Sequence, residues 1–138
     1  MVDDVTLAYF AGLFDGEGCI YISKISDMRY KANFSLSLRA CVWNADLNVL
    51  QEAVRLFGGS VSSHKPRGLS RNTCYCWTLY GLRAQHFLSI ILPYTQISRT
   101  KIETALRYPI RRGGTGLAEN EITQQATIRE TISSLNQK

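Results

Sequence analysis

Apolar and polar residues alternate along several segments of this chain, and the alternation predicts its strands. Between Asn33 and Trp43, Phe34, Leu36 and Leu38 occupy every second position, and polar residues fill most positions between them. A period of two is typical of a strand with one core face and one hydrogen-bonding face. The sequence therefore predicts two pairs of strands, connected within each pair by 26–32 and 66–72. The other three strands are expected at Cys19 to Ile25, Ser60 to Lys65 and Thr73 to Tyr80.

Helical periodicity predicts the segments that precede, separate and follow the strand pairs. Leu47, Leu50 and Val54 recur at helical spacing in the second helix, which a pair of glycines closes. The last helix has an apolar stripe that is too loose to indicate its packing partner. The predicted helices run from Thr6, as N-cap, to about Asp15, from 44–46 to Phe57, from about Leu82 to Leu92, from Ser98 to about Tyr108, and from about Leu117 to Leu135.

The order of these elements predicts an α+β fold with a four-stranded antiparallel sheet. At 138 residues and 45% apolar composition, the chain 1–138 fits a single domain. Its core is expected at about 7–108, followed by a basic, glycine-rich link at 111–116 and a C-terminal helix. Helices covering one face of the sheet would leave the other face open. The side chains then expected on the open face are Tyr21, Ser23, Asn33, Ser35, Ser37, Arg39, Ser62 and His64.

A basic charge balance narrows the class of partner. The formal net charge of +5 favours a polyanion such as nucleic acid, although ordinary soluble proteins also carry such a charge. Two-stranded ribbons fit the DNA major groove, where Arg, Asn, Ser and His side chains bond to base edges. Lys65, Arg67 and Arg71, at the second strand connection, are expected to hold phosphates. A solvated strand surface explains any single one of these residues equally well.

Other features of the composition argue against a membrane or secreted protein. No apolar run approaches the roughly 18 residues that span a bilayer, and the N-terminus lacks the basic start of a signal peptide. We therefore expect a soluble, intracellular protein with no membrane partner. The cysteines Cys19, Cys41, Cys74 and Cys76 form no Cys-x-x-Cys pair, and we expect reduced core thiols rather than zinc ligands or disulfides.

The segment from Leu7 to Ile20 carries the strongest candidate chemistry. An apolar helix runs into Asp15 and Glu17, and the adjacent Gly16 and Gly18 can adopt backbone angles that other residues resist. The C-terminal end of a helix carries partial negative charge, so two carboxylates there are unfavourable unless a cation binds. The pattern therefore predicts a cation site.

Small residues precede these carboxylates on the same helix. Ala8, Ala11 and Gly12 are expected along one side together with Asp15. The spacing Ala8-x-x-x-Gly12 permits another helix to approach closely. Tight packing of this helix on its own sheet is the alternative explanation.

The nine residues 10–18, Phe-Ala-Gly-Leu-Phe-Asp-Gly-Glu-Gly, closely resemble the signature of the LAGLIDADG homing endonucleases. Gly12, Asp15 and Gly18 stand at the expected places, and Glu17 replaces the second acidic residue conservatively. The predicted order of elements resembles that family's αββαββα core, and 92–106 resembles its usual late segment. The resemblance covers roughly residues 7–108 and includes a single copy of the motif.

The single motif implies a homodimer, because monomeric members of the family carry two copies. In that family the motif helices pack against each other, which assigns Ala8, Ala11 and Gly12 to a dimer interface. The carboxylate-bearing ends of the two helices would then converge. Each subunit would read one half-site of a long, pseudo-palindromic double-stranded DNA target.

The resemblance also implies a metal-dependent active site. Glu17 corresponds to the direct ligand of a divalent cation, expected to be Mg²⁺ with Mn²⁺ as a possible substitute. Asp15 is expected to support the site or to bind the metal, and the carbonyl of Gly16 is a further candidate ligand. Asn44 corresponds to the polar active-site residue that follows the second strand. No small-molecule cofactor is expected.

A basic residue usually completes the family's active site, and this sequence departs from the family there. Ser98 stands where a lysine is common, so Arg99 and Lys101 are the candidates to neutralise developing phosphate charge. A solvated helix surface explains these two residues equally well. The sequence thus leaves open whether Arg99 and Lys101 take part in catalysis or lie on a solvated surface.

The resemblance implies an intron- or intein-encoded endonuclease that makes staggered double-strand cuts with 3′ overhangs, in an organelle or in bacterial, archaeal or phage-infected cytoplasm. A noncatalytic nucleic-acid binder on the same scaffold, such as an intron RNA maturase or a DNA-binding regulator, is the alternative. A structural dimerisation module is a third possibility. Retention of Glu17 favours the nuclease, because an acidic residue facing phosphate repels the ligand when no metal is bound.

Overall fold

The structure, a computed structural model, describes residues 2–26, 34–64, 73–110 and 117–137. It confirms the α+β class and the predicted order of elements. The elements are α1 (Asp4–Glu17), β1 (Gly18–Ser26), β2 (Phe34–Asn44), α2 (Leu47–Phe57), β3 (Ser60–His64), β4 (Cys74–Tyr80), α3 (Gly81–Ile91), the 3₁₀ turn η1 (Leu92–Tyr94), α4 (Arg99–Leu106) and α5 (Glu119–Asn136).

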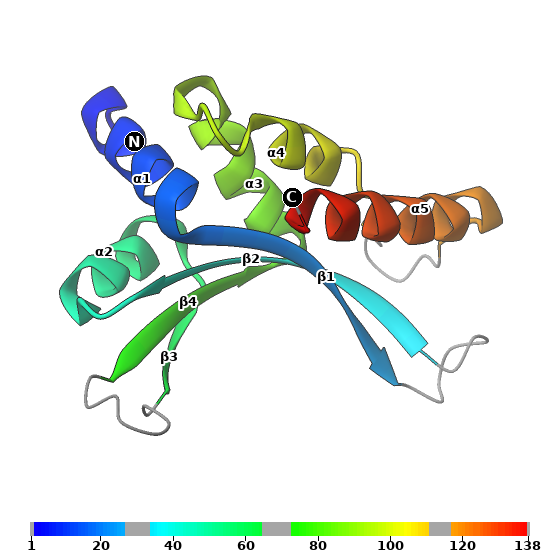
Figure 1. Cartoon of the computed structure of the whole chain (residues 1–138), viewed down its shortest axis with the longest axis horizontal. Helices are drawn as coiled ribbons and strands as arrows, with labels where there is room; N and C mark the ends of the chain where they lie inside the picture. Colours follow the sequence, from blue (N-terminus) through cyan, green and yellow to red (C-terminus); the bar gives the residue numbers. More distant parts are fainter. Residues whose placement is uncertain (1, 27–33, 65–72, 111–116, 138) are drawn as a thin grey trace.

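The four strands form one antiparallel sheet in the order β1-β2-β4-β3. The helices lie on one face of this sheet, and the strands arch away beneath them (Figure 1). No helix of the described residues covers the opposite face, which we call the uncovered face. Tyr21 of β1 lies opposite Arg39 of β2, which in turn lies opposite Tyr80 of β4. Side chains of alternate residues on neighbouring strands therefore form continuous rows across the uncovered face.

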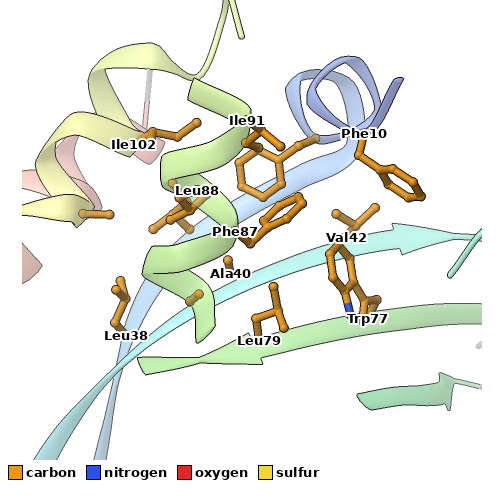
Figure 2. Packing of buried hydrophobic residues seen from close by; sticks show 14 of the residues in the cluster. Phe10, Leu38, Ala40, Val42, Trp77, Leu79, Phe87, Leu88, Ile91 and Ile102 are labelled. Carbon is orange, nitrogen blue, oxygen red and sulfur yellow. The ribbon is translucent and has the colours of Figure 1, made fainter. Parts of the chain in front are cut away.

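The hydrophobic core lies between the sheet and the helices. Phe87 of α3 makes edge-to-face contacts with Trp77 of β4, Phe14 of α1 and Phe57 of α2. Figure 2 shows the α3 side chains above Leu38, Ala40, Val42, Trp77 and Leu79 of the sheet. The indole Nε1 of Trp77 donates a hydrogen bond to Gly58 O at 2.8 Å, which satisfies its buried polar atom. These contacts fix α1 and α2 against the same strands.

The ends of the first helix differ from the prediction. Asp3, and not Thr6, is the N-cap, because the carboxylate of Asp3 accepts a hydrogen bond from Thr6 N at 2.8 Å. The helix also continues past Asp15 to Glu17, since Gly18 N donates to Phe14 O and extends the helical hydrogen-bonding pattern. Glu17 is therefore the last helical residue, and β1 begins directly after it.

The packing partner of the last helix becomes visible in the structure. Ile128 and Ile132 are buried, and α5 packs against α4 and the edge strand β1. Two polar side chains of α5 donate hydrogen bonds to carbonyls of β1: Arg129 Nε to Ile22 O at 3.2 Å and Asn136 Nδ2 to Ile20 O at 2.9 Å. The helix thereby covers backbone groups that an edge strand otherwise leaves unpaired.

Within the described residues, no helix is both long enough and apolar enough to cross a membrane.

Candidate metal and nucleic-acid site

The ends of α1 and β2 bring Glu17 and Asn44 together. Asn44 Nδ2 donates a hydrogen bond to Glu17 Oε2 at 2.5 Å, and Asn44 Oδ1 accepts one from Asp46 N at 2.7 Å. The two bonds use both ends of the Asn44 amide, so they fix its orientation. Asp46 in turn caps α2 by accepting hydrogen bonds from the backbone N–H groups of Asn48 and Val49. The exposed Glu17 carboxylate is thus held by a side chain anchored to a helix start.

The carboxylate of Asp15 points to a different partner. Its Oδ2 accepts hydrogen bonds from Gln96 N at 2.7 Å and Ile97 N at 3.3 Å, and its Oδ1 accepts one from Ser98 N at 3.0 Å. Partial burial raises the pKa of Asp15, but the backbone hydrogen bonds from Gln96, Ser98 and Ile97 outweigh it and leave the pKa below its ordinary value. Asp15 therefore fastens the loop before α4 to the end of α1.

The loop held by Asp15 leads into the two basic candidates of α4. Arg99 is exposed, and its guanidinium Nη2 lies 3.5 Å from Thr95 O. Lys101 is half-buried, and its positive charge contributes to a lowered pKa of Cys19. Because Cys19 is two residues from Glu17, this effect places the Lys101 ammonium near the strand that leaves the site. Of the two candidates, Lys101 is the one whose charge favours the thiolate form of Cys19 and so lowers its pKa.

The two glycines around the carboxylates differ in what requires them, and Gly18 has a steric role in place of the expected backbone freedom. Gly18 has φ −89° and ψ 160°, an extended conformation open to any residue, so the expected backbone freedom is not used there. A Cβ at Gly18 would instead lie 2.4 Å from Cδ2 of the buried Phe14 ring. Gly16 is helical, and a Cβ there would meet nothing within 4 Å. Close packing of Phe14 therefore explains Gly18, whereas no contact among the described residues requires glycine at position 16.

The small residues of α1 divide between two sides of the helix. Ala8 and Gly12 are exposed, and a Cβ at Gly12 would meet nothing within 4 Å. Ala11 is completely buried in the core, so its predicted place on an exposed face with Ala8 and Gly12 is wrong. The physical reason is that Phe10, Ala11 and Phe14 turn inward together toward the sheet and α3.

The uncovered face of the sheet carries the predicted polar row. By register, Tyr21, Ser23, Ser35, Ser37, Arg39, Ser62 and His64 alternate on this face, while Asn33, Lys65, Arg67 and Arg71 lie outside the described residues. Arg39 is held between two rings, with its Cζ 4.6 Å from the Tyr80 centroid and 6.0 Å from the Tyr21 centroid. Its Nε is buried and has no hydrogen-bond partner among the described residues. A planar cation stacked in this way is suited to recognition of bases or phosphates.

Two aromatic residues, Trp43 and Tyr80, also lie on this face and were not among the residues predicted for it from the sequence. Trp43 is 40% exposed, and its ring centroid lies 4.7 Å from that of His64 with the ring planes tilted by 56°. Tyr80 is 47% exposed beside Arg39. The strand period of two indicates both residues, because Trp43 lies an even number of positions from Arg39, and Tyr80 an even number from Cys74, so each pair shares a face. Exposed aromatic rings on a nucleic-acid surface provide stacking area for bases.

The four cysteines are free, and by register all four lie on the uncovered side of the sheet and not in the core beneath the helices. Cys41 and Cys76 are buried on the uncovered side of the sheet rather than among the residues beneath the helices, and Cys19 lies opposite Cys41. A hydrogen bond from Cys41 lowers the pKa of Cys19 to about 7 against the opposing effect of burial, and Lys101 adds to the lowering. The same hydrogen bond, together with burial, raises the pKa of Cys41.

Comparison with known proteins identifies the family of this chain. The model of the LAGLIDADG endonuclease family matches residues 10–101, which include α1 from Phe10 onward, the whole sheet, Glu17 and Asn44. The chain belongs to the LAGLIDADG endonuclease family. No curated protein matches its sequence. Membership places the chain in a family of DNA endonucleases.

Solved LAGLIDADG structures share the fold. The homing endonuclease I-CvuI, bound to its target in the presence of calcium, is 18% identical, with a TM-score of 0.72 over 95% of this chain and 82% of that chain. The archaeal intron-encoded homing endonuclease I-Vdi141I, complexed with DNA, is 15% identical, with a TM-score of 0.71 over 95% and 84%. A second I-CvuI complex, with an I-CreI target and magnesium, is 20% identical, with a TM-score of 0.62. In that comparison this chain spans 65% of the other chain and matches over 75% of its own length.

The donor atoms of this LAGLIDADG chain suit a hard divalent cation. Glu17 provides an exposed carboxylate, and oxygen is the donor that Mg²⁺ and Ca²⁺ prefer. Both oxygens of Asp15 are engaged by backbone N–H groups, which leaves Glu17 as the available carboxylate of the pair. No group of three or more His, Cys, Asp or Glu residues in the described parts of the chain is arranged to hold a metal.

Proposed function

We propose that this chain is a divalent-metal-dependent, site-specific DNA endonuclease that acts as a homodimer on a long, pseudo-palindromic target. The observation that carries the proposal is the exposed Glu17 carboxylate, which Asn44 holds where α1 and β2 end. A partly buried acid with both oxygens engaged by backbone groups, as in Asp15, would speak for a structural role. An oriented, exposed acid in a chain whose sheet also has an uncovered polar and aromatic face speaks for a cation that meets phosphate.

Each residue of the site has a distinct part in this function. Glu17 supplies the anionic ligand, and Asn44 limits the rotation of its carboxylate. Asp15 holds the loop that leads to Lys101, whose positive charge would balance phosphate charge. Arg39, stacked between Tyr21 and Tyr80, would contact DNA from the uncovered face.

The expected metal is Mg²⁺, with Glu17 and the carbonyl of Gly16 as candidate ligands. When bound, such a cation activates water and stabilises charge on the scissile phosphate and its leaving oxygen. The chain itself contributes positioning: its helix end and strand end hold Glu17 where a second subunit and DNA can supply further oxygen atoms. The family pattern then implies one Glu17 per strand and a staggered cut with 3′ overhangs.

The outward face of α1 supports a homodimer. Ala8, Gly12 and Gly16 recur every four residues on this helix and are exposed, and a Cβ at either glycine would meet nothing within 4 Å in the described parts of the chain. Val5 is 80% exposed on the same helix, and Ile97, which Asp15 ties to the helix end, is also 80% exposed. A helix with bare glycines and exposed apolar residues permits close contact with a second copy of itself.

The experiment is cleavage of DNA that spans the uninterrupted insertion site of the gene encoding this chain. We expect double-strand cutting with Mg²⁺ and none with a chelator. In the Glu17→Gln variant, cutting should fall by at least about a thousandfold, because the amide keeps the size but loses the anionic ligand. DNA binding measured in Ca²⁺ should persist. The matched control is Glu130→Gln on the exposed side of α5, which should cut at the unsubstituted rate.

Cutting by Glu17→Gln at the unsubstituted rate would contradict the mechanism. Specific binding to DNA or to the intron RNA without any cutting under Mg²⁺ or Mn²⁺ would instead identify the noncatalytic binder. Ser98, at the place of the usual family lysine, is the observation that keeps this second function under test. Parallel assays on the DNA and on the intron transcript separate the two outcomes.

A further inference from the structure

Two thiol groups lie side by side on the uncovered face of the sheet. Cys19 of β1 and Cys41 of β2 are direct partners in the antiparallel ladder, and their Sγ atoms are 3.4 Å apart. Cys19 is half-buried, whereas Cys41 is only 2% exposed. The pair therefore has one thiol that solvent reaches and one that lies directly behind it.

The geometry of the ladder permits a covalent bond between them. Paired residues of antiparallel strands have Cα atoms about 4.5 or 5.5 Å apart, depending on their hydrogen-bonding position, and disulfides bridge Cα separations of about 4.4 to 6.8 Å. Both side chains project from the same face of the sheet, since partners in a ladder share a face. We propose that Cys19 and Cys41 form a reversible disulfide that regulates the site at Glu17.

The oxidant is a small-molecule disulfide, and the exchange balances in two steps. The Cys19 sulfur attacks the oxidant, forms a mixed disulfide and releases one thiol molecule. The Cys41 sulfur then attacks the Cys19 sulfur, which forms the internal disulfide and releases the second thiol molecule. Both cysteines lose a proton and together lose two electrons, which reduce the oxidant. A small dithiol reverses the sequence.

The position of the pair connects its oxidation to the site. Cys19 is two residues after Glu17, and Cys41 is three residues before Asn44. Forming the bond shortens the Sγ separation by more than 1 Å, to about 2.05 Å. Because the ladder spacing already suits a disulfide, side-chain rotation and small shifts of the two strands close this gap, and the ends of these strands carry the Glu17–Asn44 hydrogen bond. Displacements of about 1 Å can slow an enzymatic step a hundredfold, so we expect oxidation to slow cutting.

The first test detects the disulfide without any DNA. The reduced full-length protein is incubated with glutathione disulfide, alkylated, digested and analysed by mass spectrometry. We expect a peptide containing Cys19 joined to one containing Cys41, and its loss after dithiothreitol treatment. Cys19→Ser should abolish this linkage, whereas Cys74→Ser should retain it. A dominant Cys41–Cys76 linkage, or none after prolonged incubation, would overturn the proposal, because Cys76 also lies beside Cys41.

The regulatory step rests on the proposed nuclease function and has its own readout. Oxidised protein should cut DNA at least about tenfold more slowly, and dithiothreitol should restore the rate. Cys19→Ser and Cys41→Ala should cut at the same rate before and after oxidant, with thermal melting to confirm that both fold. A mapped Cys19–Cys41 disulfide with unchanged cutting would overturn regulation. Absence of cutting in the reduced protein would count against the nuclease, while the mapped linkage would still report on the thiol pair.

Discussion

Asn44 donates its side-chain amide to Glu17 across 27 residues of sequence, and the bond joins the end of β2 to the end of α1. The second bond of Asn44, from Asp46 N, connects the same amide to the start of α2. Through Asn44, the Glu17 carboxylate is connected to β2 and to the start of α2 as well as to its own helix. In a site that holds a cation, such a partner fixes the direction of the ligand oxygen.

Replacing this partner tests its positioning role. In Asn44→Ala we expect cutting to fall by about 10- to 100-fold, because the Glu17 carboxylate loses its oriented hydrogen bond. The Mg²⁺ concentration needed for half-maximal rate should rise, while the melting temperature changes little. Asn48→Ala is the matched control, because Asn48 is exposed on α2 and contributes only its backbone to the cap. An unchanged metal dependence in Asn44→Ala would refute a role in holding the ligand.

Asp15 makes a prediction about stability and pH. Its pKa in the folded chain is below the ordinary value of 3.8, so its contribution to stability is present above about pH 4 and is lost as the pH falls through the folded value. Asp15→Asn should cost about 1 kcal/mol at neutral pH, after allowance for solvent screening, because an amide nitrogen would face backbone donors.

Chemical denaturation at neutral and acidic pH measures this contribution. The stability difference between the unsubstituted chain and Asp15→Asn should be constant above about pH 5 and should shrink below about pH 4. A difference that persists unchanged in acid would show that the Asp15 charge does not stabilise the fold. Asp4→Asn is a matched control at the other end of α1, since Asp4 is exposed and bonds to the Tyr94 hydroxyl rather than to backbone N–H groups.

Alanine substitutions at Gly18 and Gly16 test whether packing against Phe14 is the reason for glycine at position 18. Gly18→Ala should destabilise the chain by about 1 to 3 kcal/mol, because its Cβ would overlap the buried Phe14 ring. Gly16→Ala should leave the subunit core intact, as its Cβ would meet nothing within 4 Å. Denaturant unfolding compares the two variants. Equal stabilities of the two would contradict the packing explanation for Gly18.

Gly12 tests the homodimer that we propose. Gly12→Leu adds a bulky side chain at an exposed position where a Cβ meets no described residue within 4 Å, so folding should be retained. In a symmetric dimer the clash occurs twice, and the dimer affinity should fall by at least about thirtyfold. Sedimentation velocity measures the monomer fraction, and Ala126→Leu on the exposed side of α5 is the matched control. Dimers of unaltered strength in Gly12→Leu would exclude this face.

Local patterns of the sequence determined most of the fold. The period of two at Phe34, Leu36 and Leu38 and the helical spacing at Leu47, Leu50 and Val54 are properties of neighbouring residues, so they place strands and helices without tertiary information. The motif at 10–18 likewise identified the family, because it is contiguous. Errors occurred where neighbouring caps compete, as at Asp3 and Thr6, which differ by three residues and both suit an N-cap.

What the tertiary structure decided depends on contacts between distant residues. The sequence placed Asp15 and Glu17 side by side, yet the fold directs Asp15 to the loop at 96–98 and Glu17 to Asn44. It also turned Ala11 into the core and set Cys19 against Cys41. A sequence period states which residues share a face, but only the packed chain determines what that face meets, because its partners come from far along the sequence.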